Sequence, residues 1–190
     1  MNELPWIILL HQLIFQAMFF TKNIRLKRRI GGPIRGTNLE ANLAIGLFIA
    51  FIASTLAIAF IMPAPDETSP LPAAVTRTGG LVLMLASLLL ARAAMKDLGD
   101  SWRVGVIDDA NTELIERGIY RFSRNPFFLA YLVSFAAYGI ALQSAALLGL
   151  LLACFAATHA MILKEEAFLE DSHGNLYTAY KQRVPRYIGF

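Results

Sequence analysis

Five long apolar stretches constrain this chain more than any other feature of its sequence. They run over residues 4–20, 41–62, 80–95, 126–142 and 145–163. A helix that crosses a bilayer needs about 20 predominantly apolar residues, and it satisfies its own backbone hydrogen bonds in lipid. The sequence therefore predicts an all-α integral membrane protein with five transmembrane helices. Because only Gln143 and Ser144 separate the last two stretches, we expect these helices to form a tight antiparallel hairpin.

The basic residues predict how the helices are oriented, because cytoplasmic loops carry an excess of Lys and Arg. With the N-terminus outside and the C-terminus in the cytoplasm, the cytoplasmic segments are 21–40, 96–125 and 164–190. Of the 17 Lys and Arg residues, only Arg77 then falls on the outer side. A four-span alternative without the stretch 80–95 would place the three arginines of residues 117–124 outside. We therefore favour five spans, with the basic loop 22–35 facing anionic lipid.

The composition agrees with a membrane protein and excludes several soluble classes. Hydrophobic residues make up 56% of the chain and charged residues 16%, against roughly 25% charged in an average soluble domain. There is no phosphate-binding loop and no dinucleotide-binding glycine motif. The three histidines are far apart, and Cys154 is the single cysteine, so we expect no metal site. We also expect no nucleic-acid partner, because no soluble module carries the basic residues.

Polar side chains concentrate in the segments 97–125 and 164–186, which flank the predicted hairpin. Because the hairpin helices are antiparallel, both segments meet at one cytoplasmic mouth. In the first segment, Asn-Pro at positions 125–126 is typical of an N-cap followed by the first helical residue. A helix N-terminus favours an anion, and Arg121 and Arg124 add positive charge. We interpret this end as a carboxylate or phosphate site.

The second segment opens with two adjacent acids, Glu165 and Glu166, at the end of the last apolar stretch. Adjacent residues on a helix point about 100° apart, so at most one of them faces the neighbouring helix directly. A carboxylate this close to hydrocarbon is costly unless it is paired or faces a polar cavity. An acid that faced the anion site would complete a receptor for a zwitterion.

A few polar residues lie inside the predicted spans. Gln12 and Gln16 lie one turn apart in the first span, next to His11. They either line a polar cavity or make interhelical hydrogen bonds, and the second role is the commoner one. His159 lies about two turns from Glu166 in the last span. We expect His159 to pack within the bundle, with a cavity-facing position as the alternative.

Two runs of residues carry a resemblance to a known family. Residues 114–128 contain L-I-x-x-G-I-Y followed by R-N-P-x-F. Residues 165–185 read E-E-x-x-L-x-x-x-H-G-x-x-Y-x-x-Y-x-x-R-V-P, and L-G-D-S-W-R-V-G precedes both runs at 98–105. In this order, and separated by a helical hairpin, they resemble the isoprenylcysteine carboxyl methyltransferase and phospholipid methyltransferase superfamily of integral membrane enzymes. The resemblance covers residues 98–186, nearly half of the chain.

Three positions depart from the commonest pattern of that superfamily. Thr112 stands where many members have a histidine, Asn125 replaces the histidine of R-H-P, and Phe128 replaces a tyrosine. Asparagine forms hydrogen bonds but does not ionise, so the departures exclude an ionisable histidine at the first two positions. The S-W-R-x-G-V and R-N-P-x-F forms are similar to those of the bacterial branch. This similarity implies a bacterial inner membrane.

The resemblance implies a methyltransferase that uses S-adenosylmethionine. The carboxylate of this cofactor would suit Arg121 and Arg124, and its ammonium would suit Glu165 or Glu166. The expected cofactor-binding residues are Leu114, Gly118, Tyr120, Arg121, Arg124, Asn125, Pro126, Glu165, Glu166, Tyr177 and Tyr180. The tyrosines would pack on adenine or anchor the chain at the membrane surface. For catalysis we expect Glu166 to accept a proton from an amine acceptor and Arg183 to orient an anionic one.

The expected reaction is methyl transfer to a lipophilic acceptor that enters from the bilayer, at the cytoplasmic face. The resemblance implies carboxyl O-methylation of an isoprenylcysteine-like substrate, with N-methylation of a phospholipid or other amino-lipid as the alternative. An NADPH-dependent, sterol-reductase-like enzyme and a non-catalytic membrane protein are further alternatives. We expect one membrane domain over residues 1–190. In it, residues 1–96 form a three-span scaffold and residues 97–190 a methyltransferase-like core.

Overall fold

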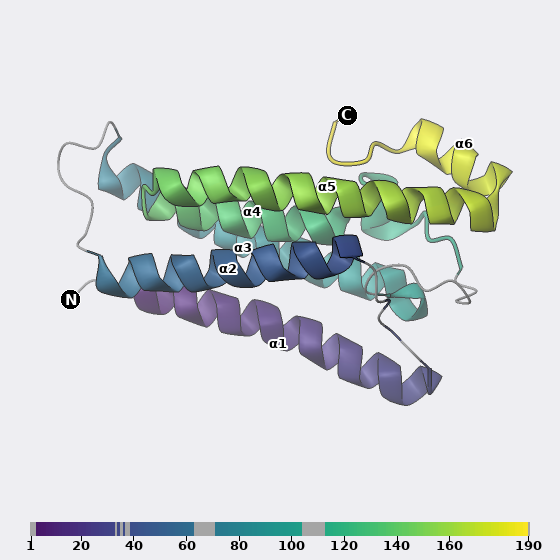
Figure 1. Cartoon of the computed structure of the whole chain (residues 1–190), viewed down its shortest axis with the longest axis horizontal. Coiled ribbons are helices and arrows are strands. Elements are labelled where there is room, and N and C mark those ends of the chain that lie inside the picture. The colour runs from purple at the N-terminus through teal and green to yellow at the C-terminus, as the bar shows by residue number, and fades with distance from the viewer. Residues whose placement is uncertain are drawn as a thin grey trace.

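The chain forms a bundle of long helices, with a short helix lying at one end (Figure 1). The computed structural model describes residues 3–32, 34, 36, 39–62, 71–103 and 113–189. The helices are α1 (Leu4–Ile30), α2 (Leu39–Ile61), α3 (Ala73–Leu98), α4 (Pro126–Ala141), α5 (Ala145–His173) and α6 (Asn175–Arg183), with 3-10 turns η1 (Gly99–Ser101) and η2 (Gly118–Arg121). Successive long helices run in opposite directions (Figure 1). The ends of α1, α3 and α5 therefore lie near the starts of α2 and α4.

Four helices of the described chain are long and apolar enough to cross a membrane, namely α1, α2, α5 and the continuous helix formed by α3 and η1. The remaining predicted span corresponds to α4, which is apolar but has only 16 residues, or about 24 Å of helix. Eleven of these 16 residues are buried, because α4 packs against α3 on one side and α5 on the other. The protein is thus a multi-pass membrane protein built from four long apolar helices and one shorter, enclosed helix.

Several helices extend beyond the apolar stretches that predicted them. The basic residues of positions 22–29, expected in a loop, lie on the last turns of α1. Nothing in this segment breaks a helix until Gly31, which adopts a left-handed conformation (φ 69°) and donates its N–H to the carbonyl of Lys27 at 3.0 Å. At the other end of the chain, α5 continues to His173, so the two adjacent acids remain on a helix.

The last two long helices form the tight hairpin that the sequence predicts. Residues 142–144 join α4 to α5. The Ser144 N–H donates to the carbonyl of Gly139 at 2.9 Å, and the Ser144 hydroxyl accepts the N–H of Leu147 at 3.3 Å, which caps α5. This short turn brings the acids of α5 back to the level at which α4 begins.

Close backbone approach joins α3 to α4. A Cβ added to Gly80 of α3 would lie 2.6 Å from the Cβ of Ala141 and 3.0 Å from the carbonyl oxygen of Ala137, both on α4. Small residues allow membrane helices to approach closely, which increases their van der Waals contact where no hydrophobic effect drives them together. The α3–α4 contact therefore depends on glycine and alanine at these positions.

The polar residues of the first span form interhelical hydrogen bonds, the commoner of their two expected roles. The Tyr138 hydroxyl of α4 donates to Gln12 Oε1 at 2.9 Å and also contacts His11 Nδ1. His11 Nε2 lies 2.9 Å from the carbonyl of Met84 and 3.0 Å from the Ser87 hydroxyl on α3. These contacts tie α1 to α3 and α4 inside the bundle.

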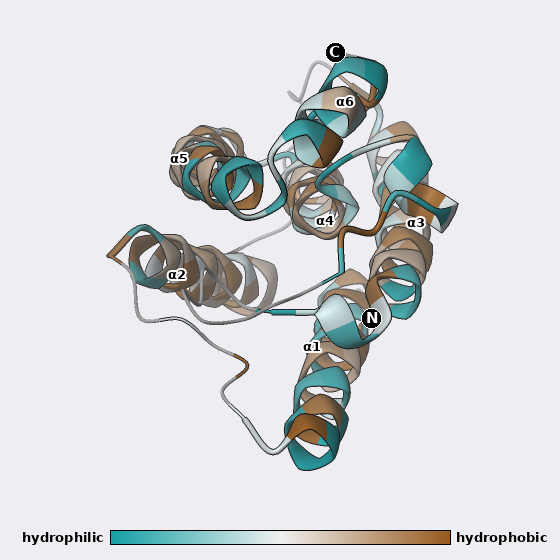
Figure 2. Cartoon of the chain, turned by 90° about the vertical axis from the view of Figure 1, so that its right-hand side faces the viewer, coloured by the Kyte–Doolittle hydropathy of each residue, from teal (hydrophilic) through white to brown (hydrophobic). Residues whose placement is uncertain are grey.

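Hydropathy divides the molecule along its length. Large apolar side chains are exposed on the shafts of the helices, where lipid would cover them, as at Trp6, Leu10, Ile49, Leu89 and Leu152. Figure 2 views the end that carries α6 and shows hydrophilic residues gathered on α6 and on the nearby ends of α1 and α5. The polar chemistry of the chain is therefore concentrated at this end of the bundle.

Candidate functional site

A cavity of about 180 Å³ lies at the hydrophilic end of the bundle. Its walls come from α1, α2, α4, α5 and α6, and from the segments 98–103 and 113–125. Apolar lining residues include Phe19, Ala44, Phe48, Phe128 and Met161. The polar lining residues include Glu113, Arg124, Asn125, Glu165 and Glu166. One cavity therefore presents both an apolar surface and a set of charged groups.

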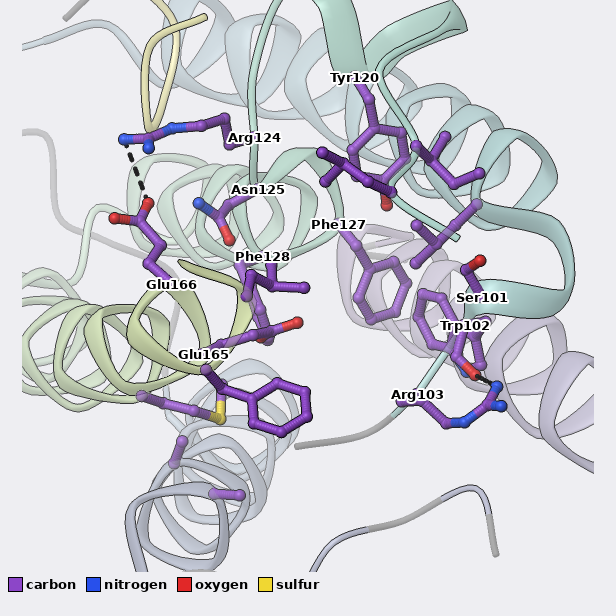
Figure 3. Close-up of a pocket in the computed structure, with 18 of the residues that line it drawn as sticks. Ser101, Trp102, Arg103, Tyr120, Arg124, Asn125, Phe127, Phe128, Glu165 and Glu166 are labelled. Carbon is purple, nitrogen blue, oxygen red and sulfur yellow. Dashed lines mark hydrogen bonds and ion pairs between the residues drawn. The ribbon is translucent and has the colours of Figure 1, made fainter. Parts of the chain in front are cut away.

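An ion-pair cluster forms one wall of the cavity. Arg124 Nη2 lies 3.2 Å from Glu166 Oε1, and Arg186 donates to both carboxylate oxygens, at 3.0 Å from Nε and 2.8 Å from Nη2 (Figure 3 shows the Arg124 contact). The side chains of Arg124 and Glu166 are only 7% and 8% exposed. The hydrogen bonds to Glu166 raise the pKa of Arg186. This bidentate contact with Arg186 fixes the orientation of the Glu166 carboxylate.

Arg124 keeps hydrogen-bonding capacity that this cluster does not use. Its Nε and Nη1 atoms are buried and have no partner in the described part of the chain. Buried polar groups almost always have a partner, because leaving a donor unsatisfied costs about 1–3 kcal/mol. Since Arg124 lines the cavity, its free donors suit an anionic acceptor group of a ligand there.

The segment after α6 folds back onto the turn before α4. The Arg124 N–H donates to the carbonyl of Pro185 at 3.0 Å, and the Asn125 side-chain amide donates to the carbonyl of Arg186 at 3.3 Å. Asn125 stands at the N-cap position as expected, but its side chain makes no capping hydrogen bond to α4. Pro126 begins the helix as predicted. Sequence reasoning missed Arg186, since it meets Glu166 only through this fold-back.

The two adjacent acids of α5 have different surroundings. Glu166 faces the two arginines, whereas Glu165 lines the cavity and makes no hydrogen bond or ion pair with any other described residue. Figure 3 shows the two side chains diverging from neighbouring positions of the helix. The two acids thus face different groups, as adjacent positions on a helix predict. Glu165 is the acid available to a ligand.

The three predicted tyrosines are buried rather than exposed at the membrane surface. Tyr120, Tyr177 and Tyr180 are at most 6% exposed, and all three line the cavity. The Tyr180 hydroxyl donates to the carbonyl of Tyr120 at 2.7 Å, which joins α6 to η2. Burial raises the pKa of each phenol, so these tyrosines stay neutral. Leu114, another predicted residue, packs against the cluster of Tyr177, Tyr180 and Val184 and lines the same cavity.

Four predicted residues lie away from the cavity lining, namely Pro126, Gly118, Arg121 and Arg183. Gly118 has φ +62° and is held against Asp97, whose carboxylate accepts the N–H of Ile119 at 2.8 Å. Arg121 is exposed, with its guanidinium 5.2 Å from the centre of the Phe122 ring. Arg183 is 64% exposed and pairs with Glu116 at 2.7 Å. The roles expected for these residues stay predictions.

The wall opposite the ion-pair cluster comes from the segment after α3. Ser101, Trp102 and Arg103 line the cavity there, and Figure 3 shows Arg103 across from Arg124 and Glu166. Sequence reasoning placed this segment within the family resemblance and assigned no role to its side chains. Thr112, Val104 and Gly105, which belong to the quoted patterns, lie outside the described residues.

Histidines play no part in the lining of this cavity as far as the structure describes the chain. His159 Nδ1 lies 3.0 Å from the hydroxyl of Tyr187, and its ring stacks on Phe155, so His159 packs within the fold as the commoner expectation held. The described residues contain no group of three or more His, Cys, Asp or Glu side chains that could hold a metal ion.

The structure is that of a multi-pass membrane protein with a cavity whose lining is partly charged and partly apolar. The sequence profile of the phospholipid methyltransferase family matches residues 75–175, which is more than half of the chain. The chain belongs to this family. It is therefore a methyltransferase that uses S-adenosylmethionine and acts on a lipid-type acceptor, rather than a reductase or a non-catalytic membrane protein. No curated protein matches the chain.

Proposed function

We propose that the cavity binds S-adenosylmethionine at its charged wall and a lipophilic acceptor along its apolar wall. The observation that carries this proposal is Arg124, a buried arginine with two unpartnered donors in a cavity that is also lined by apolar side chains. A water-soluble cofactor and a lipid have opposite solubilities. A site that joins them must therefore touch both water and hydrocarbon, which agrees with a position at the hydrophilic end of the bundle.

The charged residues fit the methionyl end of the cofactor. The unpartnered donors of Arg124 suit its carboxylate, and the Glu166 carboxylate beside Arg124 suits its ammonium, which leaves Glu165 for the acceptor. Tyr120, Tyr177 and Tyr180 offer aromatic surface for adenine. When bound, the cofactor supplies an electrophilic methyl group on a sulfonium. The contribution of the protein is to hold the acceptor in line with that methyl at near-attack distance, which can supply about 7–11 kcal/mol.

The unpaired acid favours an amine acceptor over a carboxylate acceptor. A carboxylate nucleophile needs no base, so it would make no use of the unpaired Glu165. An amine must lose a proton before it attacks, and Glu165 is free to accept one. Glu166, the base expected from the sequence, is engaged by two arginines and is less available. We therefore favour N-methylation of an amino-lipid as the reaction, with carboxyl O-methylation of an isoprenylcysteine-like lipid as the second candidate.

We also propose how the protein is oriented in the membrane and which part of the chain forms the methyltransferase core. The hydrophilic end that carries the cavity also carries the basic turns of α1, and basic residues favour the cytoplasmic side. We place the cavity at the cytoplasmic face, with the N-terminus outside, as in a bacterial inner membrane. Residues 97–190 form the methyltransferase core. The scaffold of residues 1–96 contributes apolar lining through α1 and α2.

Titration calorimetry of the detergent-purified protein with S-adenosylhomocysteine tests the cofactor site. We expect Arg124→Leu to weaken binding by about tenfold or more, because a hydrogen bond to a charged group is worth about 1.5–3 kcal/mol. The matched control is Arg117→Leu, which removes an exposed arginine that does not line the cavity. Equal affinity of the two variants, or no binding by the native chain at millimolar cofactor, would contradict the assignment.

Labelled methyl donor then identifies the acceptor group. Membranes that contain the native chain are incubated with methyl-labelled S-adenosylmethionine, and the extracted lipids are treated with base. Label that survives base treatment marks N-methylation, whereas label released as methanol marks a carboxyl ester. The second result would reverse the order of our two candidates.

A further inference from the structure

Arg103 is a second arginine in the cavity wall, and the assignment of the cofactor leaves it without a role. It follows Trp102 directly and lies across the cavity from Arg124 and Glu166 (Figure 3). No acidic side chain of the described residues forms an ion pair with it, in contrast to Arg124, which pairs with Glu166. Arg103 is half-buried, and a cation beside apolar side chains favours a counter-charge.

Local contacts hold the guanidinium of Arg103 in place. Its Nη1 atom donates to the carbonyls of Asp100 and Trp102, at 2.7 and 2.8 Å. Its Nε atom is buried and has no partner in the part of the chain that the structure describes. The N–H groups of Nη1 therefore position the guanidinium, and the Nε donor is left unpaired. This arrangement reduces the entropy that an arginine loses on binding.

The segment that carries Arg103 is fixed to α1. The Trp102 indole N–H donates to Asn23 Oδ1 at 2.7 Å, and the Lys22 ammonium donates to the carbonyl of Gly99 at 2.7 Å. The Trp102 ring also packs edge-on against Phe127, with 4.5 Å between the ring centroids. Arg103 thus lies beside aromatic surface that suits hydrocarbon, at the boundary between the charged and apolar linings.

We propose that Arg103 determines acceptor specificity by binding an anionic group of the acceptor's head group. The inference rests on the proposed function, which assigns Arg124 to the cofactor and the apolar lining to the acceptor. The anion is the phosphate of an amino-phospholipid or the carboxylate of a carboxyl lipid. In the first case the head group is a zwitterion, with its amine toward Glu165 and its phosphate at Arg103.

Equilibrium lipid binding tests this role without requiring turnover. The probes are a phosphatidylethanolamine, N-acetyl-S-farnesylcysteine and octadecylamine, each titrated in detergent micelles. The first two carry a phosphate and a carboxylate, and the third is an amine without an anion. The variants are Arg103→Gln and Arg103→Lys, and the control is Arg117→Gln, an exposed arginine outside the lining.

We expect Arg103→Gln to raise the Kd of one anionic probe by about tenfold or more, with partial recovery in Arg103→Lys. Affinity for octadecylamine and S-adenosylhomocysteine should change by less than about twofold, as in the control. The anionic probe that responds identifies the phosphate or the carboxylate as the source. An equal loss for octadecylamine, no loss for either anionic probe, or an equal loss for S-adenosylhomocysteine would overturn the role of Arg103. Failure of the native chain to bind S-adenosylhomocysteine would instead overturn the proposed function.

Discussion

The contact between Gly118 and Asp97 allows a quantitative test of how the site is positioned. Gly118 has φ +62°, and a Cβ added to it would overlap the Asp97 carboxylate. The same carboxylate accepts the N–H of Ile119 at 2.8 Å and so holds the start of η2, the turn that carries Tyr120 and precedes Arg124. Gly118→Ala should therefore displace the carboxylate and release this turn from α3.

Two separate costs add up in this variant. A residue other than glycine at positive φ costs about 1–2 kcal/mol, and loss of a hydrogen bond to a charged group costs about 1.5–3 kcal/mol. We expect Gly118→Ala to lower the free energy of unfolding by about 2.5–5 kcal/mol in total. Gly31→Ala is the matched control. Gly31 also has positive φ (+69°), but nothing lies within 4 Å of its added Cβ, so only the first cost applies.

The free energy of unfolding of both variants is measured by titration with sodium dodecyl sulfate in mixed micelles, with circular dichroism as the signal. Binding of S-adenosylhomocysteine should weaken in Gly118→Ala and stay unchanged in Gly31→Ala. In an Asp97→Ala background, Gly118→Ala should retain only the cost of its backbone conformation. The reasoning is refuted if Gly118→Ala and Gly31→Ala cost the same, or if the Asp97→Ala background leaves the difference unchanged.

Three further predictions use the same unfolding measurement. Glu166→Gln leaves two arginines without their counter-charge. We therefore expect the free energy of unfolding to fall by about 3–5 kcal/mol and cofactor binding to weaken. A fall of less than about 1 kcal/mol would mean that the cluster is not effectively buried. Gly80→Ala should destabilise the protein by about 1–3 kcal/mol, because its Cβ would clash with α4. Gly46→Ala has open space for its Cβ and should be neutral or stabilising. Equal effects of the two variants would contradict the close packing of α3 and α4. Trp102→Phe should destabilise the protein by about 1 kcal/mol, because it loses the hydrogen bond to Asn23. Asn23→Ala in the Trp102→Phe background should then cost little more. If the costs of the two single variants simply add in the double variant, that would argue against this hydrogen bond.

Hydropathy and local chemistry determined much of this protein before any tertiary contact was known. Five apolar stretches identified the four long helices and the shorter α4, and the short separation at 143–144 identified the hairpin. The motif residues from Leu114 to Tyr180 led to the methyltransferase family, which the family profile confirms. These features are readable from sequence because helix formation and membrane insertion depend on neighbouring residues and their average hydropathy.

Only the tertiary structure decided which side chains meet. Arg186 reaches Glu166 because the chain after α6 folds back, and this contact leaves Glu165 as the free acid. Arg103 became a candidate because α1 fixes the segment around Trp102 against the cavity. Ion pairs and cavity walls depend on distances between residues remote in sequence, and these distances follow from how the helices pack. The sequence alone determined the kinds of chemistry available, and packing decided which groups are already paired and which are free for a ligand.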